Sequence, residues 1–189
     1  MTTPIDTTLT HRRITSGDAR VATFRRTYDA PIADLWDACT NPDRLARWYV
    51  PVSGDLHVGG AFRQEMMGGG TIAECDAPSF LRLVLGSSGA DEIELRLTPG
   101  DAPDTTVLEL QHATTIDQHE IGGQMFDAVY CMGGGYFPRL AALELHLRDA
   151  LPDDYDTLTF YQRADVQPIS SAGMAQMQAL LDADTAPTA

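Results

Sequence analysis

Lysine is absent from this chain of 189 residues, whose thirteen basic side chains are all arginine. The absence excludes enzymes that form a Schiff base on a lysine or use a lysine nucleophile. The arginines are also outnumbered by 27 Asp and Glu residues, which gives a formal net charge of −14. Because nucleic-acid binding depends on basic side chains that neutralise phosphates, neither nucleic acid nor an anionic membrane is expected as a partner.

Cysteines and long apolar runs are scarce as well. Cys39, Cys75 and Cys131 lie far apart and form no Cys-x-x-Cys pair, the spacing typical of zinc sites and redox dithiols. We interpret them as small buried hydrophobic residues in a reducing, cytoplasmic protein. No apolar run reaches the roughly eighteen residues of a membrane span. Residues 1–20 also lack the apolar segment of a signal peptide, so neither export nor membrane insertion is expected.

The length and the 43% hydrophobic content predict one domain with tails. Residues 1–19 are polar and Thr-rich, which favours a flexible lead-in with at most a short edge strand. The domain itself is expected over residues 20–149. Residues 150–189 form an acidic appendage, in which Met174 to Leu181 suggests a short amphipathic helix. This helix could dock on the domain or on a second subunit, and on the latter basis a homodimer is predicted.

The first part of the domain predicts one strand followed by two short helices. Residues 20–28 carry the β-branched and aromatic residues of a strand. Ile32, Leu35 and Trp36 then recur at helical spacing up to about residue 40. The Asn41-Pro42 pair is typical of a helix start, and it predicts a second helical piece that ends before residue 51.

Glycine and proline clusters then divide the chain into five short runs, which we interpret as an antiparallel meander over residues 61–67, 71–76, 80–85, 92–98 and 106–115. Alternating side chains bury one face of this sheet. Residues 116–132 read as a loop or irregular helix. The apolar spacing over 136–147 predicts a long helix, with Pro138 confined to its first turn.

Two motifs resemble a known family. The runs Ala30-Pro31-Ile32-Ala33-Asp34-Leu35-Trp36 and Asn41-Pro42-Asp43-Arg44-Leu45 are similar to the opening helices of the activator-of-Hsp90-ATPase branch of the START-like or SRPBCC superfamily. Val58-Gly59-Gly60-Ala61-Phe62 and Gly133-Gly134-Gly135-Tyr136 extend the match. The resemblance covers about residues 21–149 and implies the α+β helix-grip fold, in which a curved antiparallel sheet of about six strands wraps a long C-terminal helix.

The resemblance also implies a ligand cavity between sheet and helix, and it places these residues on the cavity wall: Trp48, Tyr49, Phe62, Leu83, Leu95, Leu110, Tyr136, Leu140 and Leu143. His112 is a tenth candidate, because its phase on the strand could direct it into the cavity. With no catalytic motif evident, we favour a non-enzymatic protein that binds an apolar or amphipathic small molecule, without cofactor. A cyclase, dehydratase or hydrolase is the first alternative. A chaperone-regulating module, suggested by the family name alone, is the second.

The sequence leaves alternatives open for the residues that could take part in catalysis, metal binding or anion binding. His112, in phase with Leu108 and Leu110, could act as a general base with Glu65 as its acid partner, or it could be a hydrogen-bonded structural residue. Glu74 and Glu144 read more readily as surface charges. The segment Asp117-Gln118-His119-Glu120 lacks a second histidine at ligand spacing, so no metal site is predicted. Gly133 to Gly135 could hold an anion at a helix start or allow a close crossing with a strand.

Overall fold

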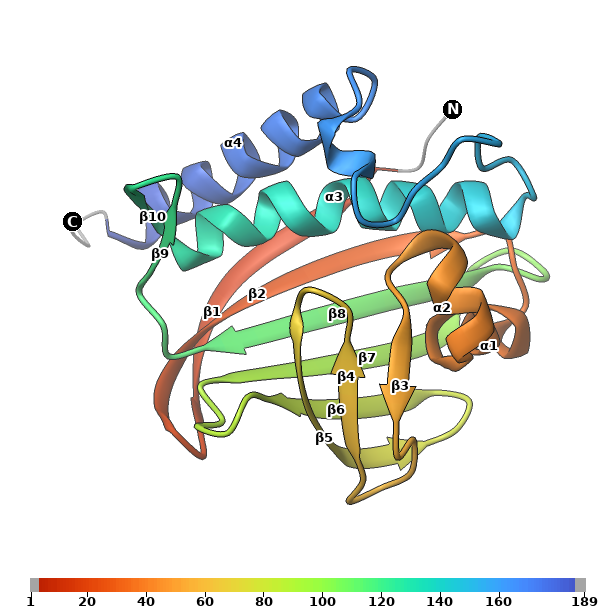
Figure 1. Ribbon diagram of the computed structural model, residues 1–189, viewed down its shortest axis with the longest axis horizontal. Helices are drawn as coiled ribbons and strands as arrows, with labels where there is room; N and C mark the ends of the chain where they lie inside the picture. Colours follow the sequence, from red (N-terminus) through yellow and green to blue (C-terminus); the bar gives the residue numbers. More distant parts are fainter. Residues whose placement is uncertain (1–3, 186–189) are drawn as a thin grey trace.

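The computed structural model describes residues 4–185. Its main feature is a curved antiparallel sheet that lies under one long helix, α3 (Ala128–Leu147), as Figure 1 shows. A second long helix, α4 (Gln167–Asp184), packs along the side of α3 that faces away from the sheet. No helix within residues 4–185 is long and apolar enough to cross a membrane.

The sheet has eight strands in the order β1-β2-β8-β7-β6-β5-β4-β3, with all neighbours antiparallel. The strands are β1 (Asp6–Ile14), β2 (Gly17–Tyr28), β3 (Val52–Gly54), β4 (Ala61–Gln64), β5 (Gly68–Asp76), β6 (Phe80–Leu85), β7 (Asp91–Pro99) and β8 (Thr106–Thr114). The helix-grip architecture is therefore confirmed, but the count of about six strands is too low.

The two additional strands lie at the edges of the sheet. β1 pairs with β2 over its full length, from Asp6 opposite Arg25 to Ile14 opposite Gly17. Residues 6–14 are thus an ordered strand and not a flexible lead-in. The sequence gives little sign of β1 because an edge strand can keep one polar face in solvent, which leaves few apolar residues to reveal the alternation.

Helices α1 (Ile32–Thr40) and α2 (Pro42–Trp48) occupy the predicted positions, although they follow the second strand and not the first. The Asn41 side chain accepts a hydrogen bond from the Asp43 amide at 3.0 Å, and Pro42 occupies the first helical position, where no amide hydrogen is needed. The Trp48 indole donates to the Ala38 carbonyl at 2.9 Å, which fastens α2 to α1.

Helix α3 begins eight residues earlier than predicted. The segment before it forms a small hairpin, β9 (Gln118–Ile121) and β10 (Gln124–Asp127), and the Asp127 carboxylate caps the helix by accepting from the Val129 amide at 2.8 Å. Pro138 therefore lies in the middle of the helix. Proline has no amide hydrogen, so the Gly134 carbonyl lacks its usual helical donor. The Ser170 hydroxyl of α4 donates to that carbonyl at 2.9 Å instead.

The appendage docks on its own domain. Residues 148–166 include a short 3-10 helix, η1 (Phe160–Gln162), and lead into α4, which buries Met177 and Leu181 against α3. α4 is an eighteen-residue helix, longer than the short one predicted. The apolar face of α4 is therefore covered within one chain and is no longer an argument for a homodimer. The homodimer itself stays an untested prediction.

The glycine triplet is explained by the crossing of α3 and α4. A Cβ atom on Gly133 would lie 2.2 Å from the carbonyl oxygen of Gly173, so the two backbones are in direct contact there. The triplet is inside α3 and not at its start, and the contact joins two helices and not a helix and a strand. Of the two alternatives for Gly133 to Gly135, the structure therefore supports a close crossing and not an anion site, because helical amides in this position already bond along the helix.

An ion pair buried between sheet and helix fixes α3 over β2. The Arg26 guanidinium donates to the Leu140 carbonyl at 2.9 Å and contacts the Glu144 carboxylate, while the Tyr28 hydroxyl donates to the same carbonyl at 2.9 Å. Glu144 also pairs with Arg148 at 2.9 Å. Burial raises the pKa of Tyr28, so its hydroxyl keeps its proton and remains a donor.

Candidate functional site

A cavity of about 530 Å³ lies between the inner face of the sheet, α1, α2 and α3. Its wall is built mainly from leucine, isoleucine, valine and aromatic side chains. Nine of the ten residues predicted to line the cavity do so: Trp48, Tyr49, Phe62, Leu83, Leu95, Leu110, Tyr136, Leu140 and Leu143. The exception is His112, which is not on the wall.

Strand register explains which side chains reach the cavity. Leu95 pairs with Leu110 across β7 and β8, and Leu81 pairs with Leu95 across β6 and β7. Side chains alternate along a strand, and directly opposed residues share a face. One row of apolar residues on each strand therefore points towards α3. On α3, Tyr136, Leu140 and Leu143 follow helical spacing and complete the opposite wall.

His112 lies on the inward face of β8, next to the lining residues, in a hydrogen-bonded network of three polar side chains. Its Nε2 atom is 3.1 Å from Oδ1 of Asp91, and its Nδ1 atom is 2.9 Å from the hydroxyl of Tyr136, which does line the cavity. His112 and Asp91 are largely buried, with side chains 14% and 19% exposed. A buried chain of this kind can move a proton or fix the direction of the tyrosine hydroxyl.

Asp91 and Tyr136, the two partners of His112, have shifted pKa values. Burial opposes ionisation of Asp91, but hydrogen bonds from His112 and Thr114 outweigh it and lower the pKa of the carboxyl group. The carboxylate is thus the form that accepts from Nε2. Burial raises the pKa of Tyr136 well above its usual value, so the phenol keeps its proton at neutral pH.

None of the three glutamates considered from the sequence is a hydrogen-bond partner of His112 within the described residues. Glu65 lies in the exposed turn after β4, and its pairing with His112 as acid and base is therefore wrong. Glu74 is exposed and lies 3.5 Å from Arg82, as a surface charge should. Glu144 is buried, contrary to the expected surface position, and its partner is Arg26.

A family model for "Activator of Hsp90 ATPase homolog 1-like protein" matches residues 29–134, more than half of the chain. The chain belongs to this family. The crystal structure of CalU16 from Micromonospora echinospora is 31% identical, covers 93% of this chain and 97% of its own, and superposes with a TM-score of 0.75. The solution structure of CalU16 gives a TM-score of 0.77 over 96% and 97% of the two chains.

An Hsp90 activator from Plasmodium falciparum is more distant, at 18% identity and a TM-score of 0.57, with 68% of this chain and 96% of that chain covered. That likeness concerns the fold alone. A search of curated proteins found no match to this chain.

Two polar residues of the site were not predicted from the sequence: Arg139, which lines the cavity, and Asp91, which bonds to His112. Asp91 is in phase with Ile93, Leu95 and Leu97, so extending that inward-facing row by two residues would have found it. Arg139 follows Tyr136 by three positions and is the one basic residue in the predicted helix 136–147 apart from His146. Helical spacing alone therefore places its side chain beside Tyr136.

Cys39, on the cavity wall, is not an activated nucleophile. All three cysteines are free, and Cys39 and Cys75 line the cavity. Burial raises the pKa of the Cys39 thiol to about 12, which leaves almost no reactive thiolate at neutral pH. Cys39 and Cys131 are half-buried, whereas Cys75 is exposed, so its interpretation as a buried hydrophobic residue is wrong.

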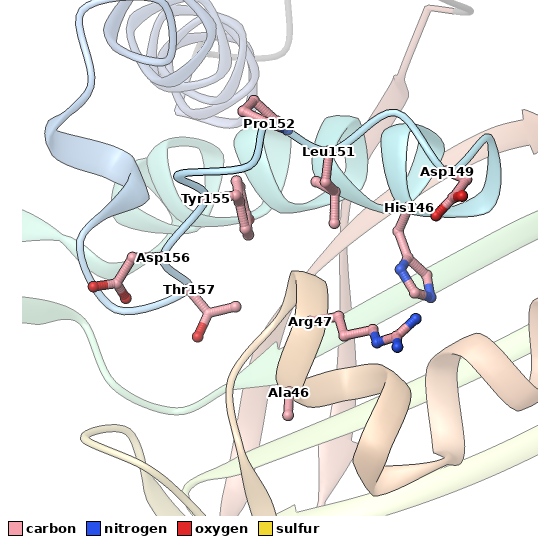
Figure 2. Close-up of a pocket in the computed structure, with 9 residues that line it drawn as sticks. All are labelled: Ala46, Arg47, His146, Asp149, Leu151, Pro152, Tyr155, Asp156 and Thr157. Carbon is pink, nitrogen blue, oxygen red and sulfur yellow. The ribbon is translucent and has the colours of Figure 1, made fainter.

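A second, more open cleft of about 480 Å³ lies between α2, the end of α3 and residues 149–157. Figure 2 shows the imidazole of His146 and the guanidinium of Arg47 pointing towards each other across it. The Arg44 Nε atom donates to Nε2 of His146 at 3.1 Å, so Nε2 is an acceptor and the imidazole is neutral. Burial, Arg44 and Arg47 together lower the pKa of His146.

This arrangement predicts a loss of stability on acidification. An unfolded chain binds a proton on His146 near its ordinary pKa of about 6.5, whereas the folded chain resists it. The contribution of His146 is therefore complete above about pH 6.5 and is lost as the pH falls through the lower folded-state pKa. Urea unfolding between about pH 7.5 and pH 5.5 should show a steeper fall in the free energy of unfolding for the wild type than for His146→Gln.

The glutamine keeps an oxygen that can accept from Arg44 but does not titrate, so the variant isolates the protonation of His146. Parallel curves for the two proteins would contradict the prediction.

Proposed function

We propose that this protein binds an apolar or amphipathic small molecule in the cavity between the sheet and α3. The observation that carries the proposal is the cavity itself. Its volume of about 530 Å³ falls within the roughly 300–1,000 Å³ typical of small-molecule sites, and its wall is mainly apolar with a few polar groups. Packed protein interiors rarely leave such a space, because voids forfeit contact energy.

The chain carries its own reporter of occupancy. Its two tryptophans, Trp36 and Trp48, both line the cavity. Titration with 1-decanol, a neutral amphipath, should therefore change the intrinsic fluorescence in a saturable way. Native mass spectrometry of freshly purified protein should show a single adduct of decanol, or of a ligand carried through purification.

A paired set of variants tests whether the molecule enters the cavity. Leu83→Phe/Leu110→Phe adds bulk to the cavity wall and should weaken decanol binding about tenfold, since a misfit of one methylene in an apolar pocket costs about that much or more. Leu145→Phe adds the same group at an exposed position of α3 and should leave the affinity unchanged. Equal affinities in the two variants, or no saturable signal and no adduct in the wild type, would refute the proposal.

A second candidate function, acid–base catalysis on a carbonyl compound, is favoured by the Asp91–His112–Tyr136 chain. With Nδ1 of His112 free to accept, the proton of Tyr136 can move to the imidazole while the phenol oxygen takes a proton from the carbon beside the carbonyl group. Asp91 then stabilises the imidazolium. The products are an enolate, a reprotonated tyrosine and the His112 imidazolium, so protons and charge balance. Because the two proton transfers occur together, the buried phenol is never left ionised.

This reaction class can be tested without knowing the natural substrate. In heavy water, the wild type should catalyse deuterium incorporation beside the carbonyl group of 2-decanone, followed by NMR. Tyr136→Phe and His112→Gln should lower the rate to that of buffer. If the wild type is no faster than Tyr136→Phe, the second candidate is wrong and the binding function is unaffected.

A further inference from the structure

Arg139 is the feature of the cavity that an apolar binding site does not explain. Nine of the thirteen arginines lie within 4 Å of a carboxylate in the described residues, and among the other four only Arg139 is not exposed. The chain has 27 acidic residues that could pair with it. A half-buried guanidinium without a carboxylate, in a chain so rich in acid, points to a counter-charge supplied from outside.

The guanidinium is held in place without being neutralised. Its NH1 group donates to the Tyr49 carbonyl at 2.8 Å, and the group lies over the rings of Tyr49 and Phe160, 4.5 and 5.3 Å from their centres. Among residues 4–185, the only hydrogen-bond partner of its NH2 group is the Met67 sulfur, a weak acceptor, at 3.4 Å. The orientation is therefore fixed while a strong charged donor remains available.

A second donor lies on the same part of the wall. The Tyr49 hydroxyl accepts from the Gln64 amide at 3.2 Å, and within residues 4–185 its own proton has no acceptor. Burial raises the pKa of Tyr49, which keeps that proton in place at neutral pH. Tyr49, Gln64 and Arg139 all line the cavity. An apolar chamber thus has a polar end that offers donors and one positive charge.

We propose that the ligand is a carboxylic acid with an apolar body, and that Arg139 binds its carboxylate while the body fills the rest of the cavity. This inference rests on the proposed binding function and narrows it to a ligand class. The alternative is a neutral ligand, with Arg139 serving only as part of the cavity wall. In that case the cavity should show no preference for a charged head group. The two are separated by ligands that differ in the head group alone.

The experiment compares decanoate, 1-decanol and decylammonium by tryptophan fluorescence at about 0.15 M ionic strength, where the net negative charge of the chain is screened beyond about 8 Å. Decanoate should bind the wild type about tenfold more tightly than decanol, despite the acidic surface, because a charge-assisted hydrogen bond is worth at least that factor. Decylammonium should bind more weakly than decanol.

Two variants assign the preference to Arg139. Arg139→Gln should weaken decanoate binding about tenfold and leave decanol within about twofold, since glutamine can still donate to the Tyr49 carbonyl. Arg25→Gln removes the same charge at an exposed position of β2 and should change neither. The decanol measurement also detects any general damage to the cavity.

The outcomes separate this inference from the function on which it rests. If decanol binds and decanoate binds no better, or if Arg139→Gln lowers decanoate affinity no more than Arg25→Gln does, the carboxylate site is refuted and the binding function stands. If no ligand of the three binds and no adduct is found, the binding function itself fails. Decylammonium tests the charge preference without any variant, because binding equal to that of decanoate would exclude a cationic recognition site.

Discussion

Replacing Glu144 with alanine is expected to lower the free energy of unfolding by about 3–5 kcal/mol, the usual effect of removing one partner from a buried ion pair. The Arg26 side chain is only 1% exposed and would keep a single good acceptor, the Leu140 carbonyl. Its Nε atom already lacks a partner within the described residues, so the guanidinium has no spare contact with which to compensate. Urea unfolding monitored by tryptophan fluorescence measures the loss.

A double variant shows where the loss comes from. Arg26→Met/Glu144→Leu replaces the pair with apolar groups of similar size and should recover most of the stability, since no buried charge is left unpaired. Glu74→Ala breaks the exposed pair with Arg82 and should cost less than about 1 kcal/mol. If Glu144→Ala costs as little as Glu74→Ala, the pair does not fasten α3 to β2 as described.

The parts of the fold that local pattern determines were predictable. α1, α2 and β6 match their predicted ranges because capping residues, proline and alternating leucines act over a few neighbouring positions. The start of α3 was missed because Gly133 to Gly135 and Pro138 all disfavour a helix locally. Their cost is offset by α4, some forty residues further along the chain, which no local pattern reveals.

The candidate site also has a part that local patterns predict, the apolar wall, and a part that they do not, the polar groups. The apolar wall followed from strand alternation and from the family resemblance, and nine of its residues were placed correctly. The polar groups were harder to place because their partners come from separate elements. His112 was recognised but assigned to Glu65, whereas its partners are Asp91 on β7 and Tyr136 on α3. Pairing across strands depends on register, which single residues do not show.

The glycine triplet permits a sharper test of the crossing between α3 and α4, because three adjacent glycines should respond differently to the same change. Gly133→Ala would place its Cβ 2.2 Å from the Gly173 carbonyl oxygen, so the two helices must separate. We expect a cost of about 1–3 kcal/mol, as for other overpacked contacts. Limited proteolysis should then cut the chain faster near α4.

The two neighbouring positions serve as internal controls. Gly134→Ala meets only the flexible end of Met174, at 3.1–3.2 Å, and should be close to neutral once that side chain shifts. Gly135→Ala meets nothing within 4 Å and should stabilise the protein by about 0.5–1 kcal/mol, because alanine is the better helix former. Equal effects at all three positions would mean that helix propensity alone governs this segment. The expected order, with Gly133→Ala least stable and Gly135→Ala most stable, requires α4 to lie directly against the first half of α3, where it supports the helix that closes the cavity.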